Sequence, residues 1–79
     1  MFFNKAEDGR NNLCGRKIAV LRKSLGLSQR ELAARLQISG LDVDKNAIQR
    51  IEAGKRFVTD IELKKLSMVF GVTADSLLE

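Results

Sequence analysis

The side chains best suited to chemistry lie in one stretch, KNAIQRIEAGKR, at residues 45–56. At about 100° per residue along a helix, Ile48 and Ile51 share one face, and the opposite face carries two amides, one guanidinium and one methyl group. An arginine can donate to both acceptors of a guanine edge, and an asparagine or glutamine can both donate to and accept from adenine. This pattern favours a helix that reads base pairs, with an ordinary solvent-exposed helix face as the alternative. The outward residues are Asn46, Gln49, Arg50 and Ala53.

Glu52 falls on the opposite, buried side of the same helix, beside Ile48. A carboxylate in that position requires a cation, because an unpaired buried charge is strongly destabilising. Arg22 flanks the apolar stripe of an earlier helical segment and is the candidate partner. The alternative is that Glu52 reaches solvent past the end of its helix.

Groups that could bind phosphate surround this predicted helix. Ser28 and Gln29 open another helical segment, where free backbone N–H groups and the helix dipole favour an anion, and no acidic residue precedes Glu31. Lys55 and Arg56 follow the residue 45–53 segment directly. These two cations could contact phosphates or shield the last carbonyl groups of that helix.

Capping signals predict the helices that must position these groups. Ser28 and Thr59 each precede a glutamate by three residues, which is the capping-box pattern, and Asp44 and Thr73 are suited to cap two further helices. Glycines close several of the segments. The predicted helices cover about residues 14–25, 28–40, 45–53 and 59–70, with a last short turn after Thr73.

Apolar side chains recur at helical spacing within these segments, so each helix has one side suited to a core. With 79 residues and no proline, the chain is expected to form one compact all-α bundle of five helices, and nothing in the sequence argues for β-structure. The predicted core residues are Ile18, Leu21, Leu25, Leu32, Ala33, Leu36, Leu63, Leu66, Val69 and Phe70, and the last short turn carries Leu77 and Leu78.

Composition limits the function further. The net charge of +4 belongs entirely to residues 13–79, which suits a polyanionic partner as well as simple solubility. The chain has no histidine and one cysteine, Cys14, and lacks metal-ligand clusters and glycine-rich phosphate loops, so we expect no enzyme, metal, cofactor or small-molecule ligand. The single cysteine indicates a reducing compartment or no redox role. Neither a signal peptide nor a membrane span is evident, which predicts a soluble, intracellular protein.

Three motifs carry a resemblance to a known family: IAVLRKSLGLSQRELAARL, NAIQRIEAGKR and DIELKKLSMVFGVTADSLL. Together they closely resemble the phage repressor and Cro type of helix-turn-helix domain, also called the XRE family, over about residues 13–78. The resemblance implies the lambda-repressor-like five-helix bundle, with Lys45 to Ala53 as recognition helix in the major groove. It also implies a transcriptional regulator, acting as a repressor, that binds a pseudo-palindromic operator in double-stranded DNA as a homodimer. Such a regulator is expected to be bacterial or phage-encoded, cytoplasmic and associated with the nucleoid.

Individual positions of the motifs imply individual roles. By resemblance, the base-reading residues are Lys45, Asn46, Gln49 and Arg50, and the phosphate-binding residues are Ser28, Gln29, Lys55 and Arg56. Arg22 and Glu52 match the structural ion pair of the family, in agreement with the placement of Glu52 argued above.

The chain departs from the family between the second and third helices. Family members usually have a glycine near the position of Gln37 and then a tight turn, whereas this chain inserts about five residues in QISGLDVDK. The insert is expected to lengthen the second helix by one turn to Gly40 and to add Ile38, Leu41 and Val43 to the core. It leaves open the tilt of the recognition helix.

The first 12 residues lie outside the resemblance and are expected to form a disordered tail or an arm. Phe2 and Phe3 could fold back on the domain or meet a second subunit. Lys5 and Arg10 could enter a minor groove, which Glu7 and Asp8 disfavour.

Two further alternatives stay open. Candidate dimer surfaces are Phe57, Val58, Val72 and the last helix, but these side chains could instead pack within the domain. The alternative to DNA binding is an adaptor or antitoxin-like module that uses the same fold to hold a protein partner.

Overall fold

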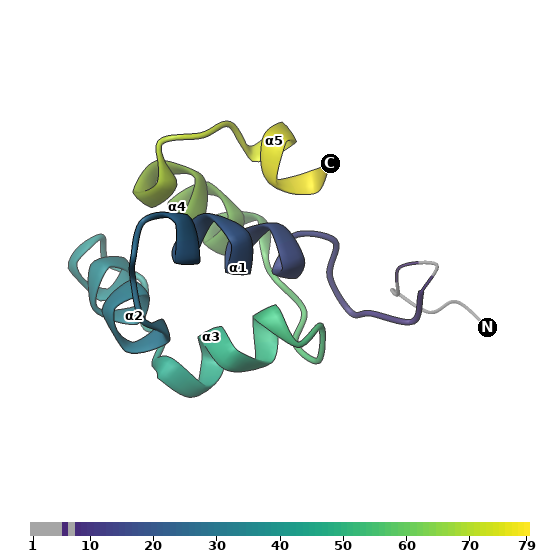
Figure 1. The fold of residues 1–79 in the computed structure, drawn as a ribbon, viewed down its shortest axis with the longest axis horizontal. Helices are drawn as coiled ribbons and strands as arrows, with labels where there is room; N and C mark the ends of the chain where they lie inside the picture. The colour runs from purple at the N-terminus through teal and green to yellow at the C-terminus, as the bar shows by residue number, and fades with distance from the viewer. Residues whose placement is uncertain (1–5, 7) are drawn as a thin grey trace.

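The computed structural model describes residue 6 and residues 8–79. Helices are the only regular elements in this part of the chain, which confirms the predicted all-α fold (Figure 1). The predictions for Phe2, Phe3, Lys5 and Glu7 lie outside the described residues. The helices are α1 (Gly15–Ser24), α2 (Gln29–Ile38), α3 (Lys45–Glu52), α4 (Asp60–Phe70) and α5 (Ala74–Leu78).

The helices begin where the capping signals predicted. At α2, the Ser28 hydroxyl oxygen accepts from the Glu31 N–H at 3.0 Å, and Glu31 Oε1 accepts from the Ser28 N–H at 3.0 Å. The hydrogen bond from the Ser28 backbone lowers the pKa of Glu31. Thr59 forms the same reciprocal pair at α4, and Asp44 Oδ1 accepts from the N–H of residue 47 at 2.8 Å to open α3. Short-range hydrogen bonds therefore fix the helix starts.

Most predicted core residues are buried, but Leu25 and Ile38 are not. Leu25 is 52% exposed because it follows the last turn of α1, at the point where the chain leaves the helix. Ile38 is 87% exposed because it lies two residues after the buried Leu36, on the opposite side of α2. The fully buried large side chains are Ile18, Leu32, Leu36, Ile48, Ile51, Leu66 and Leu77, with Leu21, Leu41, Leu63, Val69 and Phe70 packed around them.

The joint between α2 and α3, residues 39–44, is packed and hydrogen-bonded. The helix α2 ends at Ile38 rather than near Gly40. Gln37 Nε2 donates to the Val43 carbonyl at 2.7 Å, and Lys65 Nζ from α4 donates to the Ser39 carbonyl at 2.8 Å. Val43 itself is only 4% exposed. The insert therefore holds α3 against α2 through its own backbone contacts.

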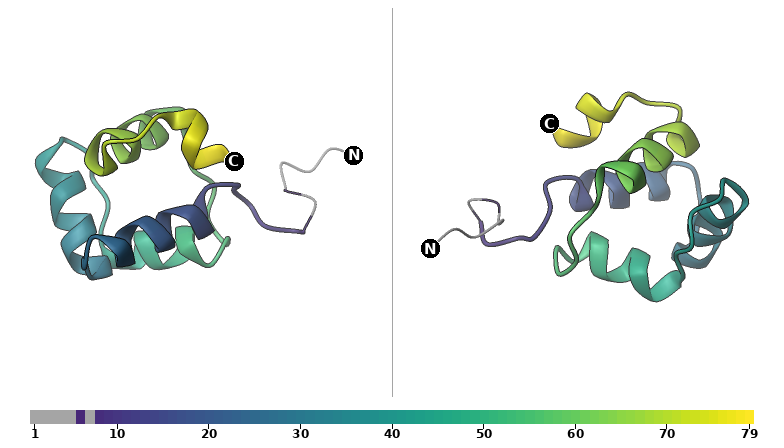
Figure 2. Two further views of the ribbon diagram at one scale, coloured as in Figure 1. Left: turned by 45° about the horizontal axis from the view of Figure 1, so that its top comes forward. Right: turned by 180° about the vertical axis from the view of Figure 1, so that it is seen from behind.

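The helix α1 lies at the centre of the bundle. It contacts α3 on one side and α5 on another, while α2 contacts both α3 and α4. Figure 1 shows α3 along the lower edge of the molecule, with α5 at the upper edge, and Figure 2 shows the same arrangement from two other directions. One long side of α3 is therefore left for contacts outside the described domain.

Candidate nucleic-acid interface

The uncovered side of α3 is polar. Ile48 and Ile51 are 0% and 2% exposed and anchor α3 to the core. The side that faces away from them is exposed and carries no carboxylate within residues 45–53. The exposed residues on α3 and at its end are Lys45, Asn46, Gln49, Arg50 and Ala53.

Two shallow hollows lie on this side, and Asn46 and Arg50 line both of them. These two side chains therefore stand between the hollows, at the middle of the exposed face. The first hollow, of about 370 Å³, is lined by Asp44, Asn46, Ala47, Arg50 and Arg56. The second, of about 280 Å³, is lined by Asn46, Gln49, Arg50, Ala53 and Lys55.

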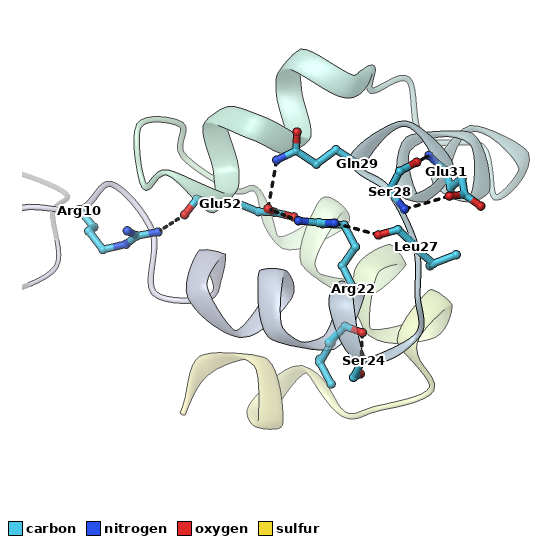
Figure 3. Close-up of polar contacts among 9 residues, drawn as sticks. Arg10, Arg22, Ser24, Leu27, Ser28, Gln29, Glu31 and Glu52 are labelled. Atoms are coloured by element: carbon cyan, nitrogen blue, oxygen red, sulfur yellow. Dashed lines mark hydrogen bonds and ion pairs between the residues drawn. The ribbon is translucent and has the colours of Figure 1, made fainter.

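The ion pair predicted between Arg22 and Glu52 is present at the buried side of α3. Arg22 Nε lies 2.6 Å from Glu52 Oε2, Arg22 Nη2 lies 3.0 Å from Glu52 Oε1, and the two side chains are 11% and 9% exposed (Figure 3). The hydrogen bond to Glu52 raises the pKa of Arg22. Arg22 also donates to the Leu27 carbonyl at 2.8 Å. The pair thus joins α1 to the end of α3 and to the turn before α2.

The order of the helices, the polar outer face of α3 and the buried pair behind it match a known domain type. A model of the helix-turn-helix family matches residues 18–77. The chain belongs to the XRE-type helix-turn-helix family. This is a non-enzymatic family whose members bind double-stranded DNA. The chain is therefore a DNA-binding helix-turn-helix regulator. A search of curated proteins found no match to the chain.

The start of α2 in this XRE-type domain is partly engaged within the fold. Gln29 Nε2 donates to Glu52 Oε1 at 3.1 Å, so one of its amide hydrogens is held in the ion-pair cluster (Figure 3). The Ser28 N–H and hydroxyl oxygen are used in the capping box, which leaves the hydroxyl hydrogen to donate. Phosphate binding by Ser28 and Gln29 stays a prediction, and Ser28 is the more exposed of the two.

The two cations after α3 have different environments. Lys55 is exposed, whereas Arg56 donates to both carboxylate oxygens of Glu62, at 2.9 and 2.8 Å, and to the Phe57 carbonyl at 3.1 Å. The Arg56 hydrogen bond lowers the pKa of Glu62, and the same contact raises the pKa of Arg56. Arg56 therefore has an intramolecular partner that the sequence did not predict. The sequence pattern places Glu62 only in the capping box that opens α4.

Residues 10–12, just before α1, contact the domain, although residues 1–12 are expected from the sequence to form a disordered tail or an arm. Arg10 Nη2 donates to the Glu52 carbonyl at 2.6 Å, so Arg10 points into the domain rather than away from it (Figure 3). Asn11 and Asn12 donate to carbonyl groups beyond Ile51. We name residues 10–12 the N-terminal strap. Its partners are about 40 residues away along the chain, so no local pattern could have revealed it.

The described residues bear on three other kinds of site: a reactive thiol, a metal site and a membrane span. Cys14 is 1% exposed, and burial raises the pKa of its thiol, which makes it a core residue. Within residues 8–79 and at Ala6, no three His, Cys, Asp or Glu side chains are grouped so as to hold a metal ion. None of the helices described is long and apolar enough to pass through a bilayer.

Proposed function

We propose that this protein is a sequence-specific transcriptional repressor that reads double-stranded DNA with α3 in the major groove. The observation that carries the proposal is the exposed face of α3, where Asn46, Gln49 and Arg50 lie opposite the buried Ile48 and Ile51. Amides and a guanidinium can each make two hydrogen bonds to a base edge. The exposed face of α3 carries no carboxylate that would repel the phosphates of DNA.

We assign roles to the polar groups from their exposure and position. Arg50 stands between the two hollows and is the candidate for a guanine edge, and Asn46 beside it is the candidate for adenine. Lys45 precedes Asn46 at the start of α3, and Gln49 lies between Asn46 and Arg50 along the chain. Lys55 is the first candidate for phosphate contact. Arg56 is a weaker candidate for phosphate contact than Lys55, because the Arg56 guanidinium already donates to the Glu62 carboxylate.

We further propose that two copies bind a pseudo-palindromic operator. In such complexes the half-sites are about 34–36 Å apart, one helical turn, and the symmetry of the protein mirrors that of the DNA. Phe57 and Leu78 are 53% and 43% exposed and are the candidates for the dimer surface. Val58 and Val72, the other candidates from the sequence, pack against the core.

The first experiment is binding to a pool of random-sequence duplex DNA across a series of salt concentrations, followed by selection of the tightest sequences. A DNA reader that contacts several phosphates loses affinity steeply, with a log–log slope of about −0.9 for each phosphate neutralised. Absence of duplex binding at about 50 mM salt, where electrostatic attraction is strong, would refute the proposal and favour the protein-partner alternative.

Two single variants then separate base reading from phosphate contact on the selected duplex. Arg50→Ala is expected to weaken discrimination at one base pair by about 1–3 kcal/mol, because it removes a bidentate contact. Lys55→Ala is expected to weaken binding to all sequences alike and to make the salt slope shallower by about 0.9. If Arg50→Ala weakens all sequences equally, Arg50 does not read a base.

A further inference from the structure

The N-terminal strap, residues 10–12, covers the C-terminal end of α3. A helix leaves its last carbonyl groups without partners inside the helix. The strap supplies donors to carbonyl groups at and beyond this end. Arg10 Nη2 donates to the Glu52 carbonyl at 2.6 Å, and Asn12 Nδ2 donates to the Arg56 carbonyl at 2.7 Å and to the Ile51 carbonyl, which also accepts from the Gly54 N–H, at 3.1 Å. Asn11 donates through its backbone to the Gly54 carbonyl at 2.8 Å and through its side chain to the Lys55 carbonyl at 3.1 Å.

Two glycines allow the strap and α1 to come this close. A Cβ atom on Gly15 would collide with the Ile51 carbonyl oxygen and would lie 2.7 Å from Asn12 Oδ1. A Cβ atom on Gly54, which has φ of 76°, would lie 2.6 Å from Arg10 Cζ. Asn12 Oδ1 also accepts from the Gly15 N–H at 2.8 Å, so one asparagine joins the start of α1 to the end of α3.

The groups proposed to meet DNA depend on this end of α3. The helix has only eight residues. Its N-terminal end is fixed by the Asp44 cap and the joint, residues 39–44. Its C-terminal end carries Arg50 and leads to Lys55. The strap donates hydrogen bonds to the Glu52 carbonyl, between these two residues, and to the carbonyl of Lys55 itself.

We propose that the N-terminal strap is a positioning element for DNA binding, with Asn12 as its central residue. This inference rests on the proposed function. The strap holds the last turn of α3 and the backbone of Lys55 in the arrangement that DNA requires, without itself touching DNA. When the strap is disrupted, the end of α3 becomes mobile, and DNA must then order it at a cost in affinity.

The test uses Asn12→Ala, which changes neither charge nor the proposed DNA-facing residues. Binding to the selected duplex is measured across a salt series at a temperature where circular dichroism shows the variant fully folded. We expect Kd to rise about tenfold, which is within the range of one ordinary hydrogen bond, with the salt slope unchanged because no phosphate contact is lost. Amide hydrogen exchange in the last turn of α3 is expected to speed up in the free protein.

Asn12→Ser is the matched control, since a serine oxygen can still accept from the Gly15 N–H but cannot reach the two carbonyl groups. Asn12→Ser is expected to bind DNA as weakly as Asn12→Ala. If serine restored full affinity, only the hydrogen bond to the Gly15 N–H would be needed for binding, and the proposal would be overturned. Unchanged affinity in a folded Asn12→Ala would overturn it as well.

Arg10→Ala distinguishes positioning from direct contact. We expect weaker binding with an unchanged salt slope. A slope shallower by about 0.9 would show that Arg10 contacts a phosphate and would overturn the positioning role. If the unmodified chain binds no duplex, the proposed function fails, and the inference falls with it; binding by the unmodified chain with no effect of the variants refutes the inference alone.

Discussion

Removal of the Arg22 guanidinium should cost this domain much of its stability. Arg22→Met keeps an unbranched apolar side chain but leaves the Glu52 carboxylate, 9% exposed, with the Gln29 amide as its remaining side-chain donor among the described residues. Removing one partner of a buried pair typically costs about 3–5 kcal/mol. The total stability of a chain of this length is about 4–12 kcal/mol, so the loss is a large fraction of it.

Urea and thermal denaturation measure this loss. Each kcal/mol lowers Tm by about 4–8 °C in a domain of this size. Lys23→Met is the control, because it removes an exposed cation from the same helix and should change stability by less than about 0.5 kcal/mol. The double variant Arg22→Met/Glu52→Met should lose less than the sum of the two single variants. Additive losses would refute the argument that the two charges stabilise the domain as a pair.

Two further predictions concern contacts at the edges of the core. The hydrogen bond from Arg56 lowers the pKa of Glu62 in the folded protein. The pair therefore stabilises the fold at pH values above the unfolded pKa of about 4.3, and this stabilisation is lost as the pH falls through the lower pKa of folded Glu62. Unfolding free energies measured between about pH 5 and pH 2 should therefore fall less in Glu62→Gln than in the unmodified chain, and an identical decline would contradict this assignment. Gln37→Ala removes the hydrogen bond to the Val43 carbonyl and should lower the free energy of unfolding in urea by about 0.5–1.5 kcal/mol. Gln49→Ala, at an exposed position, is its control, and equal stability of the two variants would show that the joint does not depend on this contact.

The sequence predicted features that depend on short spacings. The capping boxes at Ser28 and Thr59 join residues three apart, so the pattern contains both partners. The position of Glu52 on the buried side of α3 follows from helical periodicity, and the need for a cation follows from its charge. The choice of Arg22 required only that α1 cover the isoleucines of α3.

Features that depend on tertiary distance could not be predicted in this way. Nothing local indicates that Asn12 bonds residues 51 and 56, or that Arg56 turns towards Glu62 instead of solvent. The errors at Leu25 and Ile38 have two other origins. Leu25 follows the last turn of α1, where the chain leaves the periodic pattern. Ile38 is still within α2, but it lies on the opposite side of that helix from the buried Leu36, so its apolar character alone did not place it in the core.

Gly15, the first residue of α1, also bears on how this domain could be redesigned. Exchanging glycine for alanine inside a helix usually gains about 1 kcal/mol, so a designer who ranks substitutions by helix propensity would choose Gly15→Ala early. The added methyl group would instead push against the Ile51 carbonyl oxygen and separate α1 from the end of α3. At this position the better helix former is the worse residue, and stabilising substitutions are better sought on the exposed side of α1.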